Sequence, residues 1–437
     1  MNRVLVANRG EIALRIIRSC RDLGIESVAA YTQVDHGLPY LEFADDRVCI
    51  GHHDYLSERQ MLAAALSRGC DGVHPGYGFF AEHAGFAARV ESEGLIFVGP
   101  SSKHIALMAD KAAARQFMAD HGVPVMPGSS TAIDTLEEAT STAALLGYPV
   151  MLKASHGGGG RGIRLVHSAA GLHEAWAEVR QQAAALFDSE AVYLEKYLEQ
   201  ARHVELQVTG DGLGKVTCQG ARDCSVQRRH QKLIEESPPP GLDAAVIDQV
   251  AERACAALAT ISYRSAGTLE FLVSGDDWYF IEMNTRIQVE HPVTEMLTGL
   301  DLVALQLQLA AGRYKAVPAA VTVVGHAIEC RINAEDAGYR PSPGLISRFQ
   351  LPGGPGIRVD THLSAGCEVS HYYDSLVAKI IAWGVDRDQA IDRMRRALGE
   401  LRVEGIAVNR KLHLQILDDP RFLAGTHDVT LLRDSQE

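Results

Sequence analysis

The segment "GTLEFLVSGDDWYFIEMN" (267–284) holds acidic residues at positions where they could bind a metal ion. Two apolar stretches flank the tetrapeptide "SGDD", a pattern typical of a β-hairpin. A turn centred in that tetrapeptide places Val273 opposite Tyr279 and Glu270 opposite Glu282. Side chains directly opposite each other in a hairpin lie about 5 Å apart at Cβ. The spacing therefore predicts two carboxylates side by side on one face.

Such a carboxylate pair indicates a bound cation. Like charges placed opposite each other destabilise a hairpin unless a cation lies between them. Asn284 lies two residues beyond Glu282, so strand alternation puts its amide on the same face. Oxygen ligands alone favour a hard cation, Mg²⁺ or Mn²⁺, which keeps coordination positions for substrate phosphates. The alternative is a solvated hairpin face with unrelated acids; the apolar neighbours favour a hairpin in the core, and hence the metal site.

A glycine-rich loop is the second feature with possible chemistry. The stretch "PVMLKASHGGGGRGIRLV" (149–166) has glycine at 157–160 and at 162. Glycine runs are often flexible linkers, but residues 149–154 and 163–166 have the composition of short strands, so the glycines join two strands. Glycine lets backbone N–H groups approach anionic oxygens. Phosphate contact and a plain hairpin tip both fit this stretch alone; combined with the metal site, it predicts binding of Mg–ATP.

Two other nucleotide motifs do not fit the sequence. A P-loop requires Gly-Lys-Ser/Thr before a helix, whereas this glycine loop leads into a strand. A Rossmann fingerprint requires G-x-G-x-x-G after the first strand, and the first turn of "VLVANRGEIALRIIRSC" has "NRGE" instead. NAD binding is therefore not expected.

The elements that must position these residues follow one another in distinct sections. Residues 1–100 alternate strand and helix, which predicts a small α/β layer with a parallel sheet. A helical pattern covers 103–122, and a compact α/β section with the glycine hairpin covers 129–200. Strands, the polar run "RDCSVQRRHQK", a proline-rich loop and a helix at 244–261 precede the acidic hairpin. Prolines and valines at 316–324 indicate a boundary before a last section, 326–437.

Composition restricts the class of protein. The 437 residues are 46% hydrophobic and 22% charged, which is ordinary for a globular protein of two or three domains. A net charge of −13 argues against a nucleic-acid-binding surface, and no stretch has the apolar length of a membrane span. The eight cysteines are scattered without a C-x-x-C pair, which indicates free thiols. With no signal segment before "MNRVLVANRGE", we expect a cytoplasmic protein.

Several motifs together resemble one family. In order they are "ANRGEIALRI", "HPGYGF", "KASHGGGGRG", "EKYL", "RDCSVQRRHQK", "FIEMNTRIQVEHPVTE", "ECRINAED" and "YYDSLVAK". The chain resembles the biotin carboxylase subunit of acetyl-CoA carboxylase and its relatives, an ATP-grasp family, over about residues 2–430. The resemblance implies a mixed α/β and α+β chain with the ATP-grasp fold. It implies a Rossmann-like N-terminal domain (1–110), an ATP-grasp domain (111–320) with a mobile lid (129–200), and a C-terminal biotin carboxylase domain (326–437).

The resemblance also implies roles for single residues. ATP would be bound by Lys111, Lys153, Gly159, Gly160, Glu195, Lys196, Tyr197, Leu198, His203 and His230, with adenine along the strand 195–198. The metal ligands would be Glu270, Glu282 and Asn284, which agrees with the hairpin argument. Bicarbonate would contact Lys232, Arg286, Gln288, Val289 and Glu290. The biotin ring would lie near Tyr77, Arg331 and Asp374.

The implied chemistry suits these residue types. Bicarbonate is a poor nucleophile until its second proton leaves, so Glu290 as general base beside an orienting Arg286 fits the need. Attack on the γ-phosphate would give carboxyphosphate, with the charge offset by Mg²⁺ and the two lysines. Carboxyphosphate hydrolyses readily, so a closing lid must exclude water. Arg331 would stabilise the biotin enolate while its nitrogen attacks CO₂.

Some assignments keep a structural alternative. Tyr77 could pack in a turn, Asp374 could cap a helix, His203 could be a satisfied strand histidine, and Arg286 with Glu290 could form a structural ion pair. The sequence also departs from the family at three positions. These are His156 for a glycine, Ala221 for a glutamate before "RDCS", and His83 for an asparagine.

The resemblance implies partner proteins, and it leaves other functions as alternatives. An "A-M-K-M"-like biotin attachment turn is absent from the sequence, so we expect a biotin carboxyl carrier protein in trans, a carboxyltransferase and a homodimer. The final acceptor stays open between acetyl-CoA, another acyl-CoA, pyruvate and urea. An ATP-grasp carboxylate–amine ligase is disfavoured by "TRIQVEHP", and a non-catalytic nucleotide-binding paralogue by Glu290 and Arg331.

Overall fold

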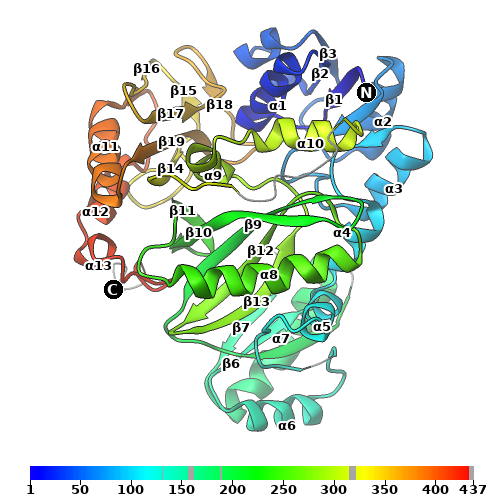
Figure 1. Ribbon diagram of the computed structural model, residues 1–437, viewed down its shortest axis with the longest axis vertical. Coiled ribbons are helices and arrows are strands. Elements are labelled where there is room, and N and C mark those ends of the chain that lie inside the picture. The colour runs from blue at the N-terminus through cyan, green and yellow to red at the C-terminus, as the bar shows by residue number, and fades with distance from the viewer. Residues whose placement is uncertain (130, 156–161, 188, 314–320, 433–437) are drawn as a thin grey trace.

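The computed structural model describes the chain except residues 130, 156–161, 188, 314–320 and 433–437 (Figure 1). Gly159 and Gly160, which the resemblance assigns to ATP, and His156, a departure from the family, lie outside the described residues. Among the described residues, none of the helices combines the length and the apolar character needed to cross a bilayer.

The N-terminal section is built on a five-stranded sheet in the order β3-β2-β1-β4-β5, and every neighbouring pair is parallel. The central strand β1 and its neighbour β2 are mostly buried runs, as expected for a parallel sheet covered by helices, whereas the edge strand β3 is partly exposed. The predicted parallel α/β layer is confirmed. Its elements are β1 (Arg3–Val6), α1 (Gly10–Asp22), β2 (Glu26–Tyr31), β3 (Asp46–Cys49), α2 (Glu58–Ser67), β4 (Gly72–His74), α3 (Ala84–Ser92) and β5 (Ile96–Phe97).

The helical pattern at 103–122 forms two helices, α4 (Ser102–Ala109) and α5 (Lys111–Asp120). Asp110 separates them because its carboxylate Oδ1 accepts hydrogen bonds from the backbone N–H groups of Ala112 and Ala113, each at 3.0 Å. The break places Lys111 in the first turn of α5.

The central feature is an eight-stranded sheet in the order β13-β12-β9-β10-β11-β14-β19-β17. Helix α8 (Ala244–Thr260) lies across one face of it (Figure 1). Each pair of neighbouring strands in it is antiparallel. The strands are β9 (Arg202–Asp211), β10 (Val216–Arg228), β11 (Gln231–Ser237), β12 (Arg264–Ser274), β13 (Asp277–Asn284), β14 (His326–Asn333), β17 (Ile357–Asp360) and β19 (Leu376–Gly384).

This sheet crosses the boundary expected between the second and third sections. Strand β11 precedes the expected boundary at residues 320–326 and β14 follows it, yet the two strands are paired. The sheet therefore includes strands from both sections. The domain limits 1–110, 111–320 and 326–437 stay a prediction. The remaining elements of this half are α9 (His291–Thr298), α10 (Leu302–Ala310), β15 (Gly344–Leu345), β16 (Arg348–Gln350), β18 (Glu368–Val369), α11 (Arg387–Glu400), β20 (Arg402–Glu404), α12 (Arg410–Leu417) and α13 (Pro420–Leu423).

A separate small layer forms from residues 129–200 and lies at one end of the molecule (Figure 1). Its three-stranded sheet has the order β7-β6-β8 and packs on two helices. Its buried residues, among them Leu152, Trp176 and Leu194, form their own apolar cluster. A unit with its own core can move as a body. Its elements are α6 (Leu136–Leu146), β6 (Val150–Ala154), β7 (Ile163–Val166), α7 (Ala169–Phe187) and β8 (Val192–Lys196).

Candidate active site

The site is built on a row of charged residues that crosses four neighbouring strands. Glu282 on β13 pairs with Glu270 on β12, Glu270 pairs with Glu205 on β9, and Glu205 pairs with Arg222 on β10. Arg222 is fully buried and donates to Glu205. Paired residues of antiparallel strands share a face, so the row presents its charges on one side of the sheet.

The hairpin is confirmed, with one correction to its register. Glu270 does face Glu282, but Val273 faces Trp278, and it is Leu272 that faces Tyr279. A β-bulge lies between Glu270 and Phe271. The turn is tighter than predicted, with Ser274 paired to Asp277, which shifts the register of the strands near it. The bulge adds one residue to a strand and so brings Glu270 back opposite Glu282.

A lysine ammonium occupies the centre of the acidic group. Lys232 Nζ lies 2.6 Å from Glu205 Oε2, 3.0 Å from Glu270 Oε1 and 2.6 Å from Glu290 Oε1. Burial alone would lower the pKa of Lys232, but the three carboxylates raise it well above its ordinary value. The ammonium therefore stays charged at neutral pH.

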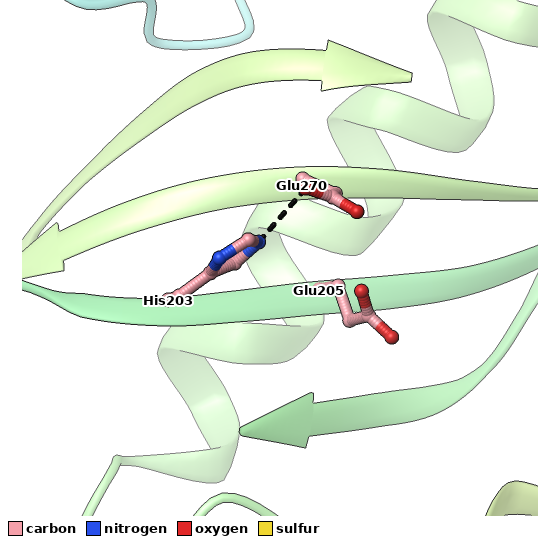
Figure 2. A group of neighbouring side chains, drawn as sticks. All are labelled: His203, Glu205 and Glu270. Carbon is pink, nitrogen blue, oxygen red and sulfur yellow. Dashed lines mark ion pairs between the residues drawn. The ribbon is translucent and has the colours of Figure 1, made fainter. Parts of the chain in front are cut away.

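Side-chain nitrogen atoms of three further residues lie against the carboxylate of Glu270. His203 Nε2 lies 2.9 Å from Glu270 Oε2, and Asn284 Nδ2 and Gln288 Nε2 donate to Oε1 at 2.7 and 2.9 Å. Figure 2 shows His203, Glu205 and Glu270 projecting from neighbouring strands. One nitrogen or oxygen atom of each lies within 4.8 Å of those of the other two. Lys232 already neutralises Glu205 and one oxygen of Glu270.

Glu282, the second carboxylate of the predicted metal site, has its own lysine partner. Lys111 Nζ lies 2.7 Å from Glu282 Oε2. Burial would lower the pKa of Lys111, but Glu282 raises it above its ordinary value, so the lysine stays charged. The carboxylates of Glu270 and Glu282, and the amide oxygen of Asn284, which here accepts from Arg286 Nη2 at 2.8 Å, are the oxygen donors that suit Mg²⁺ or Mn²⁺. The residues present therefore fit the metal predicted from the hairpin.

Glu290 is buried between two cations. Its side chain is 0% exposed; Oε1 lies 2.6 Å from Lys232 Nζ, and Oε2 accepts from Arg331 Nη2 at 2.9 Å. Burial would raise its pKa, but Lys232 and Arg331 outweigh burial and hold the pKa well below its ordinary value. Glu290 is therefore ionised at neutral pH, as a general base must be.

Two arginines are oriented by acids that the sequence did not single out. Arg331 Nε donates to Glu235 Oε1 at 2.6 Å, and its Nη2, which donates to Glu290, lies 2.5 Å from the same Glu235 oxygen. Arg286 Nε donates to Glu82 Oε2 at 2.9 Å. The ion partner of Arg286 here is thus Glu82 on the N-terminal section, which links that section to the hairpin.

Two cavities meet at this group. One, of about 690 Å³, is lined by most of the residues predicted for bicarbonate and biotin: Tyr77, Lys232, Arg286, Gln288, Val289, Arg331 and Asp374. Glu290, also predicted for bicarbonate, is not in its wall and lies buried behind Lys232 and Arg331. The other, of about 430 Å³, is lined by residues predicted for ATP: Lys111, Lys153, Glu195, Lys196, Tyr197 and Leu198. Both are lined by His203, His230, Glu270 and Glu282, which therefore lie at the junction.

A strained turn carries His230 to this junction. Strands β10 and β11 are joined by Arg229 and His230 alone, and both have positive φ, 50° and 64°. A two-residue hairpin loop with positive φ at both positions normally uses Asn or Gly. Non-glycine residues held there cost about 1–3 kcal/mol each, and such strain is common at functional sites.

On the nucleotide side, Glu195 holds two cations. Lys153 Nζ donates to its Oε2, and Arg115 Nη1 lies 3.2 Å from its Oε1. Lys196 turns away and donates to the carbonyl oxygen of Gly147 at 2.8 Å. The carboxylate of Glu195 therefore fixes Lys153 at the wall of the cavity.

On the biotin side, Tyr77 and Asp374 both line the larger cavity. The Tyr77 hydroxyl donates to Glu11. Asp374 Oδ1 accepts from the Leu376 N–H at 2.9 Å, directly before strand β19, so it does not cap a helix.

Two of the three departures from the family, His83 and Ala221, lie in the described residues, and each has a local role. His83 is the N-cap of α3, and its Nδ1 accepts from the Phe86 N–H at 3.0 Å. Ala221 is buried in the apolar cluster beneath α8. Both positions therefore serve local packing and capping in the part of the chain that the structure describes.

Sequence reasoning missed Glu205, Glu82, Glu235 and Arg222. For Glu205 a signal existed: His203, Glu205 and Gln207 alternate along "HVELQV", so polar residues line one face of a strand whose other residues are apolar. Polar alternation within an apolar, fully buried strand is typical of a site wall. Glu82 and Glu235 had no comparable signal, because their partners are distant in sequence.

A nucleotide-sized cavity between a small separate layer and a central sheet, with lysines and paired acids at its wall, defines an ATP-grasp enzyme, an ATP-dependent ligase. Three family models match in order. They are "Biotin carboxylase, N-terminal domain" (1–105), "Carbamoyl-phosphate synthase L chain, ATP binding domain" (110–316) and "Biotin carboxylase C-terminal domain" (329–434).

Similar proteins agree over the full length. A biotin carboxylase of Allochromatium vinosum is 49% identical, covering 99% of this chain and 98% of the relative. A Campylobacter jejuni biotin carboxylase–β,γ-ATP complex has a TM-score of 0.97 at 42% identity, covering 99% of this chain and 98% of the other. The biotin carboxylase domain dimer of Hydrogenobacter thermophilus 2-oxoglutarate carboxylase, with MgADP and bicarbonate, has a TM-score of 0.96 at 44% identity, covering 100% and 98%. The chain belongs to the biotin carboxylase family and is a biotin carboxylase.

Proposed function

We propose that this enzyme carboxylates biotin on a separate carrier protein, as the first half-reaction of acetyl-CoA carboxylase. The observation that carries the proposal is the buried, ionised Glu290, held between Lys232 and Arg331, which both line the larger cavity. Related proteins in complexes with β,γ-ATP, MgADP and bicarbonate support ATP, Mg²⁺ and bicarbonate as its small-molecule requirements.

In the first step Glu290 acts as general base toward bicarbonate. Lys232, Arg286 and Gln288 surround the same cavity and orient the anion. Bicarbonate oxygen attacks the γ-phosphate of ATP while Glu290 takes the proton, giving carboxyphosphate and ADP. Lys111 and Lys153 balance the charge that develops on the phosphates.

Bound by Glu270, Glu282 and Asn284, Mg²⁺ or Mn²⁺ would supply Lewis acidity toward the phosphate oxygens. Lys111, which pairs with Glu282 at 2.7 Å, keeps that carboxylate in place on the nucleotide side. His203 and His230 complete the nucleotide site, and residues 195–198, at the end of β8 and just after it, hold adenine.

In the second step carboxyphosphate breaks down to CO₂ and phosphate beside biotin. The released phosphate takes the proton of the ureido N–H, Arg331 faces the ureido oxygen and stabilises the resulting enolate form, and the biotin nitrogen then attacks CO₂. Tyr77 and Asp374 border the ring. Because Arg331 and Glu290 are hydrogen-bonded partners, the residue for the second step is already adjacent to the residue for the first.

The acceptor of the carboxyl group depends on the partner proteins. The half-reaction is common to biotin-dependent carboxylases, and one relative is part of a 2-oxoglutarate carboxylase. Acetyl-CoA is our proposal; pyruvate or urea carboxylase components are the alternatives. Affinity purification of the native complex followed by mass spectrometry identifies the carrier and the carboxyltransferase, and light scattering tests the homodimer.

Carrier-linked biotin is expected to be a better acceptor than free biotin. Free biotin should support slow, bicarbonate-dependent ADP release, and the biotinylated carrier should raise kcat/KM by about 10²-fold or more, because docking supplies orientation. Unbiotinylated carrier is the control. Equal rates with free and carrier-linked biotin would contradict the proposal, as would biotin found on this chain by mass spectrometry.

Residues 129–200 are expected to close over ATP as one body. The basis is their separate apolar cluster and the position of Lys153 and Glu195 at the cavity wall. Hydrogen exchange with and without a non-hydrolysable ATP analogue should show new protection in β6 and β8. Protection confined to residues 1–100 would show that the lid is placed wrongly.

A further inference from the structure

Two buried carboxyl groups lie side by side next to Arg331. Strand β11 pairs with β14 in antiparallel register, with Glu235 opposite Glu329. Directly paired residues share a face and lie about 5 Å apart at Cβ. Arg331 lies two residues beyond Glu329 on β14, so its side chain leaves the sheet on the same side. Both glutamates are 0% exposed.

The hydrogen bonds around this pair are incomplete if both groups are ionised. Glu235 Oε1 accepts from Arg331 Nε, but within the described part of the chain Glu235 Oε2 and both oxygens of Glu329 lack a partner. The nearby Lys379 is already engaged, at 3.0 Å from Glu11 Oε1 and 2.8 Å from the Val289 carbonyl oxygen. Arg331 is shared between Glu235 and Glu290.

One proton on Glu329 would give these two carboxyl groups a hydrogen bond between them. An ionised carboxylate without a partner in the interior is far costlier than a neutral acid with one hydrogen bond. A protonated Glu329 supplies a donor, and the open acceptor on the adjacent strand is Glu235 Oε2. Glu329 also adjoins Ala327 and Ile381, which belong to an apolar cluster with α9.

The electrostatics agree with this placement of the proton. Burial raises the pKa of Glu329 well above its ordinary value, against a smaller opposing effect of Lys379. Burial raises the pKa of Glu235 only to about 7, because Arg331 opposes it. Glu329 therefore holds a proton more strongly than Glu235, the partner that lies against Arg331.

We infer that Glu235 and Glu329 form a carboxylate–carboxylic acid pair that positions Arg331 for the biotin half of the reaction. When Glu290 accepts a proton from bicarbonate it loses the charge that holds Arg331. Glu235 then keeps the guanidinium in place while Arg331 faces biotin. The inference rests on the proposed function and adds two positioning residues to it.

Three variants and one control test the pair. Glu235→Gln and Glu329→Leu should lower the rate of biotin carboxylation by about 10- to 100-fold, the cost of misplacing a reacting group by about 1 Å. Bicarbonate-dependent ATP hydrolysis without biotin should fall much less, because Arg331 acts on biotin. Glu329→Gln, whose amide can donate as the acid does, should recover most of the loss in Glu329→Leu. The control is Glu404→Gln, an exposed carboxylate of β20.

Infrared spectroscopy tests the proton independently of activity and of folding yield. The wild-type protein at neutral pH should show a buried carboxylic-acid C=O band that is absent in Glu329→Gln and present in Glu404→Gln. A band that persists in Glu329→Gln would overturn the inference. Equal losses of carboxylation and of biotin-independent hydrolysis in Glu235→Gln would also overturn it. A wild-type enzyme without biotin-dependent turnover would instead overturn the proposed function, and the infrared result would still stand.

Discussion

Glu290→Gln is expected to lower bicarbonate-dependent ATP hydrolysis and biotin carboxylation by about 10²- to 10⁴-fold, the range that a positioned general base contributes. The substitution keeps the shape of the side chain and removes its ability to take a proton. It also leaves Lys232 and Arg331 facing a neutral amide in place of a carboxylate at 2.6 and 2.9 Å. The loss should appear mainly in kcat, because the nucleotide cavity is lined by other residues.

The decisive comparison is between turnover and nucleotide affinity. Affinity for an ATP analogue should stay close to wild type in Glu290→Gln, while product formation with free biotin and with the carrier falls together. Glu404→Gln removes an exposed carboxylate that pairs with Arg348 on the surface, so it should keep wild-type rates. Normal turnover in Glu290→Gln would remove Glu290 from the role of base.

The acidic hairpin shows how far local spacing predicts a site. Two-residue alternation was enough to bring Glu270 and Glu282 together, because antiparallel pairing is a local property of a hairpin. The register around them was wrong at Val273, since a bulge leaves no clear mark in the sequence. The two carboxylates were still paired correctly because the bulge offsets the tighter turn.

The polar run "RDCSVQRRHQK" shows where pattern analysis fails. It forms buried strand β10 and the start of β11, although its residues are mostly polar. Binary patterning places polar residues outside, and a site wall breaks that rule. Arg222 can be fully buried because Glu205, Gln207 and Thr294 accept its hydrogen bonds.

Contacts between distant segments could not be predicted from spacing at all. Glu82 meets Arg286 across 204 positions of the chain, and Glu235 meets Arg331 across 96. Only the resemblance to a family could suggest which segments converge. It supplied Arg286 and Arg331 themselves, but not the acids that orient them, Glu82 and Glu235, which line neither cavity.

Glu282→Gln is expected to abolish most turnover and to raise the Mg²⁺ concentration needed for half-maximal activity by at least about 10-fold. Even residues that only support a metal ligand change metal affinity by about 10- to 100-fold when replaced, and Glu282 is assigned as a ligand. The substitution also frees Lys111, which lies 2.7 Å from the carboxylate and would lose the charge that holds it. Titration of activity with Mg²⁺ and with Mn²⁺ measures both effects.

A matched control is available in the same hairpin. Asp277 is exposed at the start of β13, so Asp277→Asn changes the charge of the hairpin equally but at its solvent end. It should leave the metal dependence unchanged. If Glu282→Gln gave the same metal titration as wild type, the donor set deduced from Glu270, Glu282 and Asn284 would be wrong, and Glu282 would serve to hold Lys111 instead. A raised metal requirement in Glu282→Gln alone assigns the carboxylate to the cation, since charge loss in the hairpin is common to both variants.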